Sequence, residues 1–414
     1  MRLSCVFCWA KWMKLFLKSI LKEEVQDFLV EHEDEDVQKL LLKQKTVHGV
    51  PTERIVQQII GRRKAKSKLP SWYNTKGIVY PPGINLEQSS SESTARFKSD
   101  FLLENLPKRK CTGADLTGGF GIDSYFLSLH SHRIEYVEPD QELLEIVRHN
   151  HQLLGAVNIT YHHTSAETFL ALTPEKFDFL YMDPSRRKAT QKVYRLTDSE
   201  PDVVAMQSGF FEKATLVLIK TSPLLDIQQG CRELQGVAQV IVVAVENECK
   251  ELLFLLRETS SREPMIRAVD LNRSGQIISS ISFTFAEEKN SVAASSSPLT
   301  YLYEPNAAIL KAGAFKWIAQ KYQLKKLASS THLYTSDQLL NFPGRTFKIT
   351  QFAKPDKKIK DLFSDGYANI ISRNYPLSVE EIKKKTGLKQ GGENYLICTQ
   401  DENEKLVMVA DRLT

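Results

Sequence analysis

The feature that most constrains the fold of this chain is a short segment that ends a predicted strand with an acid and then turns through glycines. It reads Asp115-Leu-Thr-Gly-Gly-Phe-Gly-Ile-Asp123. Glycine permits positive φ and has no Cβ, so Gly119 and Gly121 let backbone N–H groups approach a ligand. Glu138 ends the next predicted strand, twenty-three positions after Asp115, a separation at which an acid can hold ribose hydroxyls. The sequence therefore predicts a nucleotide-cofactor site.

Two kinds of cofactor fit such a turn, and their phosphate content separates them. A dinucleotide needs three glycines and a helix N-terminus that is free to take the pyrophosphate. Thr117 stands at the first glycine position, and no third glycine follows Gly121 at the expected place. S-adenosylmethionine has no phosphate and has a cationic amino-acid end, which suits an acid at Asp115. The segment resembles motif I of class I methyltransferases. Taken alone, the glycines also fit a tight strand-to-helix turn without a ligand, but their order with Glu138 and Asp183 strengthens the cofactor interpretation.

The segments that follow alternate between strand-like and helical patterns, which is typical of a mostly parallel sheet. Two later apolar runs, 239–245 and 252–256, predict a hairpin, and the class I methyltransferase sheet ends with such a pair. The predicted fold class is α/β: a Rossmann-like class I methyltransferase sheet of seven mostly parallel strands, with a helical N-terminal region and small α+β C-terminal domains. The first five strands are expected at 111–115, 133–138, 159–163, 177–182 and 214–221.

A second group of candidate residues follows the fourth strand, in Asp183-Pro-Ser-Arg-Arg187. Methyltransferases that modify exocyclic amines have an acid or Asn, two prolines and an aromatic residue at this place. Asp183 and Pro184 match that motif, whereas Ser185 and Arg186 depart from it. An acid here can accept a hydrogen bond from an amine and orient its lone pair toward the methyl donor. We therefore assign the catalytic role to Asp183 and Pro184.

Three other groups of candidate residues lie at the same edge of the predicted sheet. Ser165, with Ala166, follows the third strand, where this class usually has an acid that contacts adenine; a helix N-cap is the favoured alternative for Ser165. Arg186 and Arg187 can clamp phosphate or stack on a base, or form a salt bridge. Lys220 is a substrate-side candidate or a surface lysine. The residues assigned to cofactor binding are Asp115, Thr117, Gly119, Gly121, Glu138, Ser165, Ala166 and Asp183.

Composition and cysteine usage exclude several function classes. The chain has 414 residues, of which 42% are hydrophobic and 25% charged, as in globular proteins, and its net charge of +5 permits nucleic-acid binding without arguing for it. No second cysteine pair completes a zinc site with Cys5-x-x-Cys8, and we predict no metal. No cysteine lies between Cys111 and Cys231 to serve a carbon-directed pyrimidine methyltransferase. Lysines interrupt the apolar N-terminus, which predicts a cytoplasmic protein.

The N-terminal part is predicted to be helical from about Leu15 to Gly61. Met13 begins its amphipathic pattern, so residues 1–12 are a candidate upstream extension of the reading frame. A basic run, Arg62-Arg63-Lys64-Ala-Lys66-Ser-Lys68, then precedes Trp72 and Tyr73. Basic residues beside aromatic ones can suit a nucleic acid. A solvated helix end, favoured by the helix dipole, is an equal alternative.

The order of these motifs and a late segment, Tyr303-Glu-Pro-Asn-Ala-Ala-Ile-Leu-Lys-Ala-Gly313, resemble a methyltransferase family of Bacteroidetes. Its members have a class I catalytic domain, a small ferredoxin-like module and a THUMP-like C-terminal domain. The resemblance implies an RNA partner, tRNA or rRNA, and the basic segments Lys354–Lys360 and Lys383–Lys389 are compatible with phosphate contacts. The predicted divisions are a helical region at 1–82, the methyltransferase domain at 83–262, the ferredoxin-like module at 275–328 and the THUMP-like domain at 329–414.

The leading hypothesis from the sequence is an S-adenosylmethionine-dependent methyltransferase that modifies a base amine in RNA. Two alternatives stay open. One is a non-catalytic RNA-binding protein that keeps the methyltransferase fold, and the other is a small-molecule methyltransferase. Binding of the cofactor, transfer to RNA and transfer to a metabolite fraction separate the three hypotheses.

Overall fold

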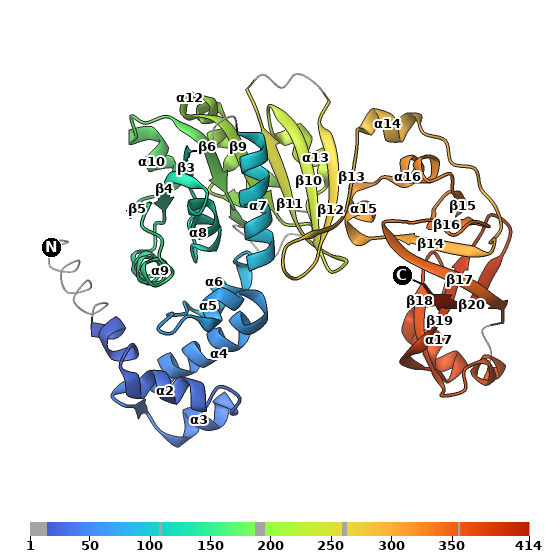
Figure 1. Cartoon of the computed structure of the whole chain (residues 1–414), viewed down its shortest axis with the longest axis horizontal. Helices are drawn as coiled ribbons and strands as arrows, with labels where there is room; N and C mark the ends of the chain where they lie inside the picture. Colours follow the sequence, from blue (N-terminus) through green and yellow to red (C-terminus); the bar gives the residue numbers. More distant parts are fainter. Residues whose placement is uncertain (1–14, 107–109, 187–194, 259–262, 355–356, 414) are drawn as a thin grey trace. The chain divides into compact units, whose positions relative to one another are not determined.

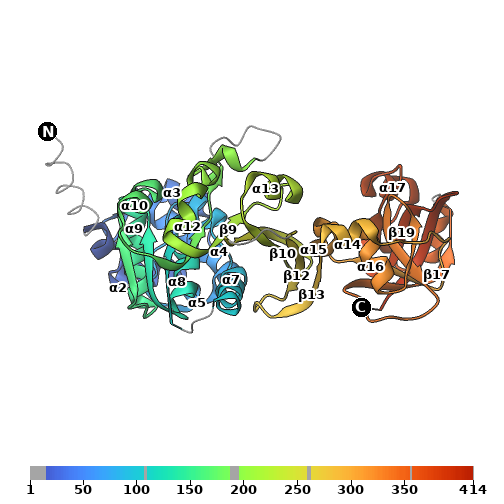
Figure 2. The same cartoon turned by 90° about the horizontal axis from the view of Figure 1, so that it is seen from above.

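The computed structural model describes residues 15–106, 110–186, 195–258, 263–354 and 357–413 (Figures 1 and 2). The chain forms two compact units. The first consists of Met1–Ala238, Leu252–Ser261 and Asn272–Gln276, and the second of Gln239–Glu251, Arg262–Leu271 and Ile277–Thr414. Within the described ranges, no helix is both long enough and apolar enough to cross a lipid bilayer.

The largest sheet has nine strands in the order β13-β12-β10-β11-β9-β6-β3-β4-β5. The neighbours from β9 to β5 are parallel, and β11 is antiparallel to β9. The strand order reverses between β3 and β6, which is where ligands bind in open α/β sheets. The bounds are β3 (Cys111–Asp115), β4 (Ser131–Val137), β5 (Ile159–His162), β6 (Phe177–Met182), β9 (Ala214–Thr221), β10 (Val237–Val245), β11 (Glu248–Leu256), β12 (Met265–Leu271) and β13 (Ile277–Phe283).

This topology confirms the predicted fold class and corrects the number of strands. The hairpin of β10 and β11 is present, and its link has positive φ at Glu246 (50°) and Asn247 (63°). The sheet has nine strands, not seven, because β12 and β13 extend it beyond β10. Strand β12 lacks a simple signal in the sequence, since Arg267 and Asp270 interrupt the apolar run by which a buried strand is recognised.

Burial and caps explain the central elements of the first unit. Strands β6 and β9 are apolar at nearly every position, as expected when both faces of a parallel sheet are covered. Asp140 begins a helix by accepting a hydrogen bond from the Glu142 amide (2.8 Å), and Ser91 begins another by accepting one from the Thr94 amide (3.3 Å). The helices of the catalytic part are α7 (Glu92–Asn105), α8 (Ile122–Ser128), α9 (Gln141–Leu153), α10 (Ala166–Leu172), α11 (Val203–Met206), α12 (Phe210–Lys213) and α13 (Ile227–Glu233).

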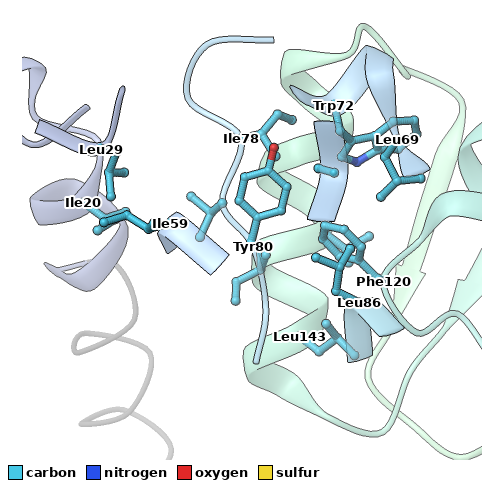
Figure 3. Close-up of a cluster of buried hydrophobic side chains, with 14 of the residues drawn as sticks. Ile20, Leu29, Ile59, Leu69, Trp72, Ile78, Tyr80, Leu86, Phe120 and Leu143 are labelled. Atoms are coloured by element: carbon cyan, nitrogen blue, oxygen red, sulfur yellow. The ribbon is translucent and has the colours of Figure 1, made fainter. Parts of the chain in front are cut away.

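The N-terminal helices share a core with the catalytic part. In Figure 3, Leu29 and Ile59 belong to the same cluster of buried side chains as Trp72, Tyr80 and Leu143. Within the predicted region 1–82, the described residues 15–82 are therefore packed onto the sheet domain by apolar contacts. Its described elements are residues 15–20, which are helical, α2 (Glu23–Glu31), α3 (Val37–Lys43), β1 (Thr46–Val47), β2 (Val50–Pro51), α4 (Thr52–Lys68) and α5 (Pro70–Asn74), with α6 (Gly83–Gln88) following.

The second unit contains a seven-stranded sheet in the order β15-β16-β14-β17-β20-β19-β18. Alternate residues of its strands line two separate apolar clusters: Ile397 belongs to one, and Leu396 and Cys398 belong to the other. The bounds are α14 (Phe285–Asn290), β14 (Tyr301–Pro305), α15 (Ala307–Ala312), α16 (Phe315–Lys321), β15 (Lys325–Ala328), β16 (Thr331–Ser336), β17 (Gly344–Phe352), η3 (Lys357–Leu362), β18 (Tyr367–Ser372), α17 (Val379–Thr386), β19 (Lys389–Gln400) and β20 (Lys405–Arg412).

Candidate active site

Asp115 ends β3 and is enclosed by the turn that follows. Its side chain is 1% exposed. Oδ1 accepts a hydrogen bond from the Thr117 amide (3.1 Å), and Oδ2 accepts one from the Ser124 hydroxyl. Burial raises the pKa of Asp115 to about 7, and the hydrogen bonds from Ser124 and Thr117 oppose this rise only in part. The acid therefore stabilises the turn from inside the protein.

The two glycines of positive φ in this turn meet different surroundings. Gly119 has φ +53° and Gly121 has φ +74°. A Cβ at Gly121 would lie 2.5 Å from Val147 Cγ1 and 2.7 Å from His151 Nε2, whereas a Cβ at Gly119 would meet only the Thr117 carbonyl oxygen, at 3.7 Å. Gly121 is thus required for the packing of α8 against α9. Gly119 has free space beside it, where a ligand can approach the backbone.

Glu138 joins the turn to the end of β4. Its Oε2 accepts a hydrogen bond from the Gly119 amide (2.9 Å), and its Oε1 accepts one from the Asp140 amide (2.8 Å). Burial raises the pKa of Glu138, and the two amides oppose that rise. Each carboxylate oxygen can accept a further hydrogen bond, so the two hydroxyls of a ribose are compatible partners.

Asp183 and Lys220 form an ion pair where β6 and β9 end. These strands are parallel neighbours, with Met182 opposite Ile219, so their ends meet at one edge of the sheet. The ammonium of Lys220 contacts Asp183 Oδ2, and the two side chains are 13% and 27% exposed. The Asp183 amide donates a hydrogen bond to Thr117 Oγ1 (2.6 Å). The predicted catalytic acid is therefore tied to the glycine turn on one side and to Lys220 on the other.

A second buried ion pair lies at the same turn and was not predicted from the sequence. The ammonium of Lys98, from α7, lies 3.1 Å from Asp123 Oδ1 and donates to the Ser90 hydroxyl (2.9 Å). Asp123 Oδ2 accepts hydrogen bonds from the hydroxyls of Ser90 (2.7 Å) and Tyr181 (2.9 Å). Burial raises the pKa of Asp123, but the charges of Lys98 and Lys220, together with the hydrogen bonds from Ser90 and Tyr181, outweigh burial and hold that pKa below its usual value. The two ion pairs are thus electrostatically linked.

The sequence contains a signal for the buried lysine. Lys98 falls in the helical stripe of Thr94, Phe97, Phe101 and Leu102, all of which are buried. A lysine on the apolar stripe of an amphipathic helix must bury its ammonium beside a partner, because an isolated buried charge is too costly. That argument identifies Lys98, but it does not identify Asp123 as the partner.

The remaining predicted residues fall into three cases. Ser165 caps α10 by accepting a hydrogen bond from the Thr168 amide (3.2 Å), as its favoured alternative proposed, and Ala166 is buried behind it. Pro184 is buried beside Asp183. Arg187 and the side chain of Arg186 lie outside the described residues. The backbone of 185–186 forms β7 (Ser185–Arg186), which pairs with β8 (Ser199–Glu200).

The basic run of α4 makes contacts inside the N-terminal region. Arg62 pairs with the buried Glu33 (3.2 Å) and lies over the Tyr73 ring, with 4.9 Å from its Cζ to the ring centroid. Lys64 contacts Glu87, and Lys68 donates to the carbonyl oxygens of Leu86 and Glu87 (both 2.8 Å). These contacts favour the structural alternative for this run over a nucleic-acid surface.

Within residues 15–106, 110–186, 195–258, 263–354 and 357–413, no group of three or more His, Cys, Asp or Glu side chains is placed to hold a metal ion. Cys5 and Cys8 lie outside the described residues. The described cysteines are Cys111, Cys231, Cys249 and Cys398, and all four are free thiols.

Two family matches cover the C-terminal part of the chain. Residues 301–343 match a ferredoxin-like domain, and residues 344–412 match a THUMP domain-like family. The matches divide this part after Pro343, whereas the sequence predicted a division after Ala328; the predicted boundaries stay predictions. No curated protein matches the chain.

The comparison with solved structures covers nearly the whole chain. A crystal structure of a proposed methyltransferase from Porphyromonas gingivalis matches with a TM-score of 0.83 and 29% identity, over 96% of this chain and 99% of that chain. An rRNA methylase from Streptococcus thermophilus matches with a TM-score of 0.30 and 14% identity, over 39% of this chain and 93% of that chain. A TM-score of 0.30 is too low to assign a substrate to this chain.

The sheet topology and the glycine turn define a class I methyltransferase, a class whose methyl donor is S-adenosylmethionine. In particular, this chain is a methyltransferase with a ferredoxin-like and a THUMP-like domain after its catalytic domain, similar over almost its full length to the Porphyromonas gingivalis protein.

Proposed function

We propose that this protein transfers a methyl group from S-adenosylmethionine to RNA, either tRNA or rRNA, in the cytoplasm. The observation that carries the proposal is the meeting of three strand ends at one sheet edge: the turn after Asp115, Glu138 and Asp183. When bound, S-adenosylmethionine supplies an electrophilic methyl group. A THUMP-like domain in the same chain supports RNA as the acceptor.

The residues at the turn fit this cofactor. The free space beside Gly119 allows close approach to the backbone, and Glu138 can accept hydrogen bonds from ribose hydroxyls. Thr117 and Gly121 hold the turn in shape, and Asp115 supplies an acid near the cationic end of the cofactor. Ser165 and Ala166, at the start of α10, are the proposed neighbours of the adenine.

A group of lysines in the second unit supports RNA binding. Two basic segments that are separate in the sequence meet there: a Cβ at Gly366 would lie 3.4 Å from Lys360 Cε, and one at Gly387, which ends α17, would lie 3.9 Å from Lys360 Cδ. Lys389 Nζ lies 5.6 Å from the centroid of the exposed Tyr367 ring. An aromatic ring among lysines suits stacked bases and phosphates. We use the name lysine face for Lys360, Lys389 and Tyr367 together with Lys384 and Lys385, which are exposed in the last turn of α17, the helix that Gly387 ends.

The acceptor atom has two candidates. The motif Asp183-Pro184 predicts a base amine as the acceptor. Asp183 would accept a hydrogen bond from the amine, and Pro184 would position the backbone beside it. The ion pair between Asp183 and Lys220 favours a hydroxyl instead, since the ammonium opposes the positive charge that an attacking amine develops and stabilises negative charge on an attacking oxygen. Arg186 and Arg187 are proposed substrate-side residues in either case.

The experiment that tests the proposal measures cofactor binding and methyl transfer separately. Calorimetry should show S-adenosylmethionine binding by the parent protein and a loss of at least tenfold in affinity for Glu138→Ala. The control, Glu145→Ala, removes an acid of α9 that pairs with Arg148 at the surface and should bind as the parent does. Equal affinity of Glu138→Ala and the parent would contradict the assignment of the site.

Methyl transfer is then measured with labelled cofactor on total RNA from cells that lack the protein. Label in RNA supports the proposal. RNA binding without transfer identifies a non-catalytic RNA-binding protein. Label in a metabolite fraction, with no RNA binding, identifies a small-molecule methyltransferase.

A further inference from the structure

The charge at the acceptor edge depends on Lys220. Asp183 by itself would present one negative charge beside the cofactor turn. The ammonium of Lys220 contacts Asp183 Oδ2, and both side chains are largely withdrawn from water, so the pair as a whole is close to neutral. The carboxylate is therefore held by the lysine.

The two kinds of acceptor respond to this pair in opposite ways. An amine nitrogen that attacks a methyl group gains positive charge, which an isolated carboxylate stabilises and a nearby ammonium opposes. A hydroxyl oxygen that attacks must lose its proton and gains negative charge, which an ammonium stabilises. Lys220 thus removes the charge that amine methylation needs and supplies the charge that hydroxyl methylation needs.

The segment after Asp183 gives a second, independent observation against a base amine as the acceptor. Ser185 occupies the place of the second proline in the amine motif, and its backbone pairs with Glu200 in the β7–β8 ladder. Its hydroxyl donates to the Glu200 carbonyl oxygen (3.3 Å). The next residue is Arg186, so this segment presents no aromatic ring at the motif position on which a base could be stacked.

We propose that the acceptor is a ribose hydroxyl of RNA, with Asp183 and Lys220 as the catalytic pair. The hydroxyl oxygen forms a bond to the methyl carbon while the carbon–sulfur bond breaks and leaves its electron pair on sulfur. The hydroxyl proton passes to the carboxylate of Asp183, and the ammonium of Lys220 donates a hydrogen bond to the oxygen as its negative charge develops. The inference rests on the proposed function, because it takes RNA as the substrate.

Alkaline hydrolysis of RNA methylated by the full-length protein tests this inference. Alkali cleaves RNA through the 2′-hydroxyl, so a methyl group on that oxygen blocks cleavage and leaves an alkali-stable dinucleotide. We expect the labelled methyl group in dinucleotides. Label in mononucleotides would overturn the inference and leave an RNA methyltransferase of a base, whereas no label in any RNA would overturn the inference together with the proposed function.

Variants of the lysine supply a test at the residue. Lys220→Met should lower the transfer rate by about 100-fold or more, the usual loss for an oxyanion donor, and should leave S-adenosylmethionine affinity within threefold by calorimetry. Lys220→Arg should restore part of the rate because it keeps the donor and the charge. The control is Lys213→Met, at the opposite end of β9, where Lys213 donates to the Thr173 carbonyl oxygen (2.6 Å).

Each outcome of this second test is decisive. An unchanged or faster rate for Lys220→Met would contradict the proposed role of the lysine, since an amine acceptor gains from a freed Asp183. If Lys220→Met does not fold, the inference is still tested by the transfer rate of Lys220→Arg and by the position of the label in the RNA that the parent protein methylates.

Discussion

At the glycine turn, the role of each residue follows from its immediate neighbours. Gly121 cannot gain a Cβ because Val147 and His151 occupy the space, while Gly119 has room beside it. Asp115 is buried under the same turn and is held by Thr117 and Ser124. The turn is therefore packed closely against α9 at Gly121 and has free space beside Gly119, where a cofactor can approach the backbone.

Asp115 should make the stability of the protein depend on pH. Its pKa is raised from 3.8 to about 7, so the folded protein binds this proton more tightly than the unfolded chain does. The free energy of unfolding should therefore fall as the pH rises through that range, by at most about 1.4 kcal/mol per pH unit. Asp115→Asn removes this loss. The free energy of unfolding of the variant minus that of the parent, measured by urea unfolding, should therefore be more positive at pH 8 than at pH 5.

A comparison with the parent is needed because another buried group acts in the opposite direction. Burial lowers the pKa of His151 to about 4, so its contribution is lost as the pH falls from 6.5 toward 4. This contribution cancels between Asp115→Asn and the parent. The control is Asp140→Asn, at an exposed N-cap. The same stability difference for Asp115→Asn at both pH values would contradict the prediction.

At the scale of elements, α7 and α8 are joined by a charge as well as by apolar contacts. The two helices pack against each other, and Lys98 reaches from α7 to Asp123 in the first turn of α8. Since the same carboxylate accepts hydrogen bonds from Ser90 and Tyr181, this pair connects α7, α8 and β6. It sets the direction in which α8 leaves the glycine turn.

Removal of Lys98 alone should destabilise the folded protein. Lys98→Met leaves Asp123 buried beside fewer positive charges and should lower the free energy of unfolding by about 3–5 kcal/mol. Asp123→Asn in the same background should restore part of this loss, because an amide keeps hydrogen bonds to Ser90 and Tyr181 without the charge. Urea unfolding of the two single variants and the double variant measures the coupling, which we expect to exceed 1 kcal/mol.

The control for this cycle is an exposed ion pair in the N-terminal region. Lys22 and Glu24 are 3.5 Å apart, with side chains 52% and 53% exposed, and an exposed pair of this kind contributes little. Its coupling should stay below 1 kcal/mol. A coupling of Lys98 with Asp123 no larger than that of the control pair would show that the buried charges do not depend on each other.

At the scale of the whole molecule, the proposed cofactor turn and the lysine face lie in different compact units. The catalytic turn depends on β3, β4 and β6 of the first unit. The lysine face depends on η3, α17, β18 and β19 of the second unit. Substitutions at the surface of one unit should therefore leave ligand binding by the other unchanged.

The triple variant Lys384→Gln, Lys385→Gln and Lys389→Gln tests this separation. It should weaken RNA binding and reduce the slope of log K against log salt by about 2, since each lost phosphate contact removes about 0.7 for single-stranded RNA. Its affinity for S-adenosylmethionine should equal that of the parent in calorimetry. The matched control removes three exposed lysines of the N-terminal region: Lys39→Gln, Lys43→Gln and Lys45→Gln. Equal RNA affinity of the two triple variants would contradict a role for the lysine face.

The order of elements could be predicted wherever local pattern and burial agree. Strands β6 and β9 have the predicted bounds because each is a nearly continuous apolar run in a parallel sheet. Strand β3 also has the predicted bounds, because the acid and the glycine turn that follow mark its end. Strand β12 could not be predicted, because its Arg267 and Asp270 obscure the pattern. The segment after Pro305 forms two helices, α15 and α16, because Gly313 ends the first one in the left-handed conformation, with φ +82°.

By itself, the sequence determined the class of the protein and the backbone of its turn, because glycines and an acid after a strand are local features that few other structures require. Only the tertiary structure decided how the charges are paired. Asp183 meets Lys220, and Lys98 meets Asp123, across 37 and 25 residues of chain. Such partners are set by the packing of β6 beside β9 and of α7 beside α8, and an ion pair between distant residues leaves no periodic signal in the sequence.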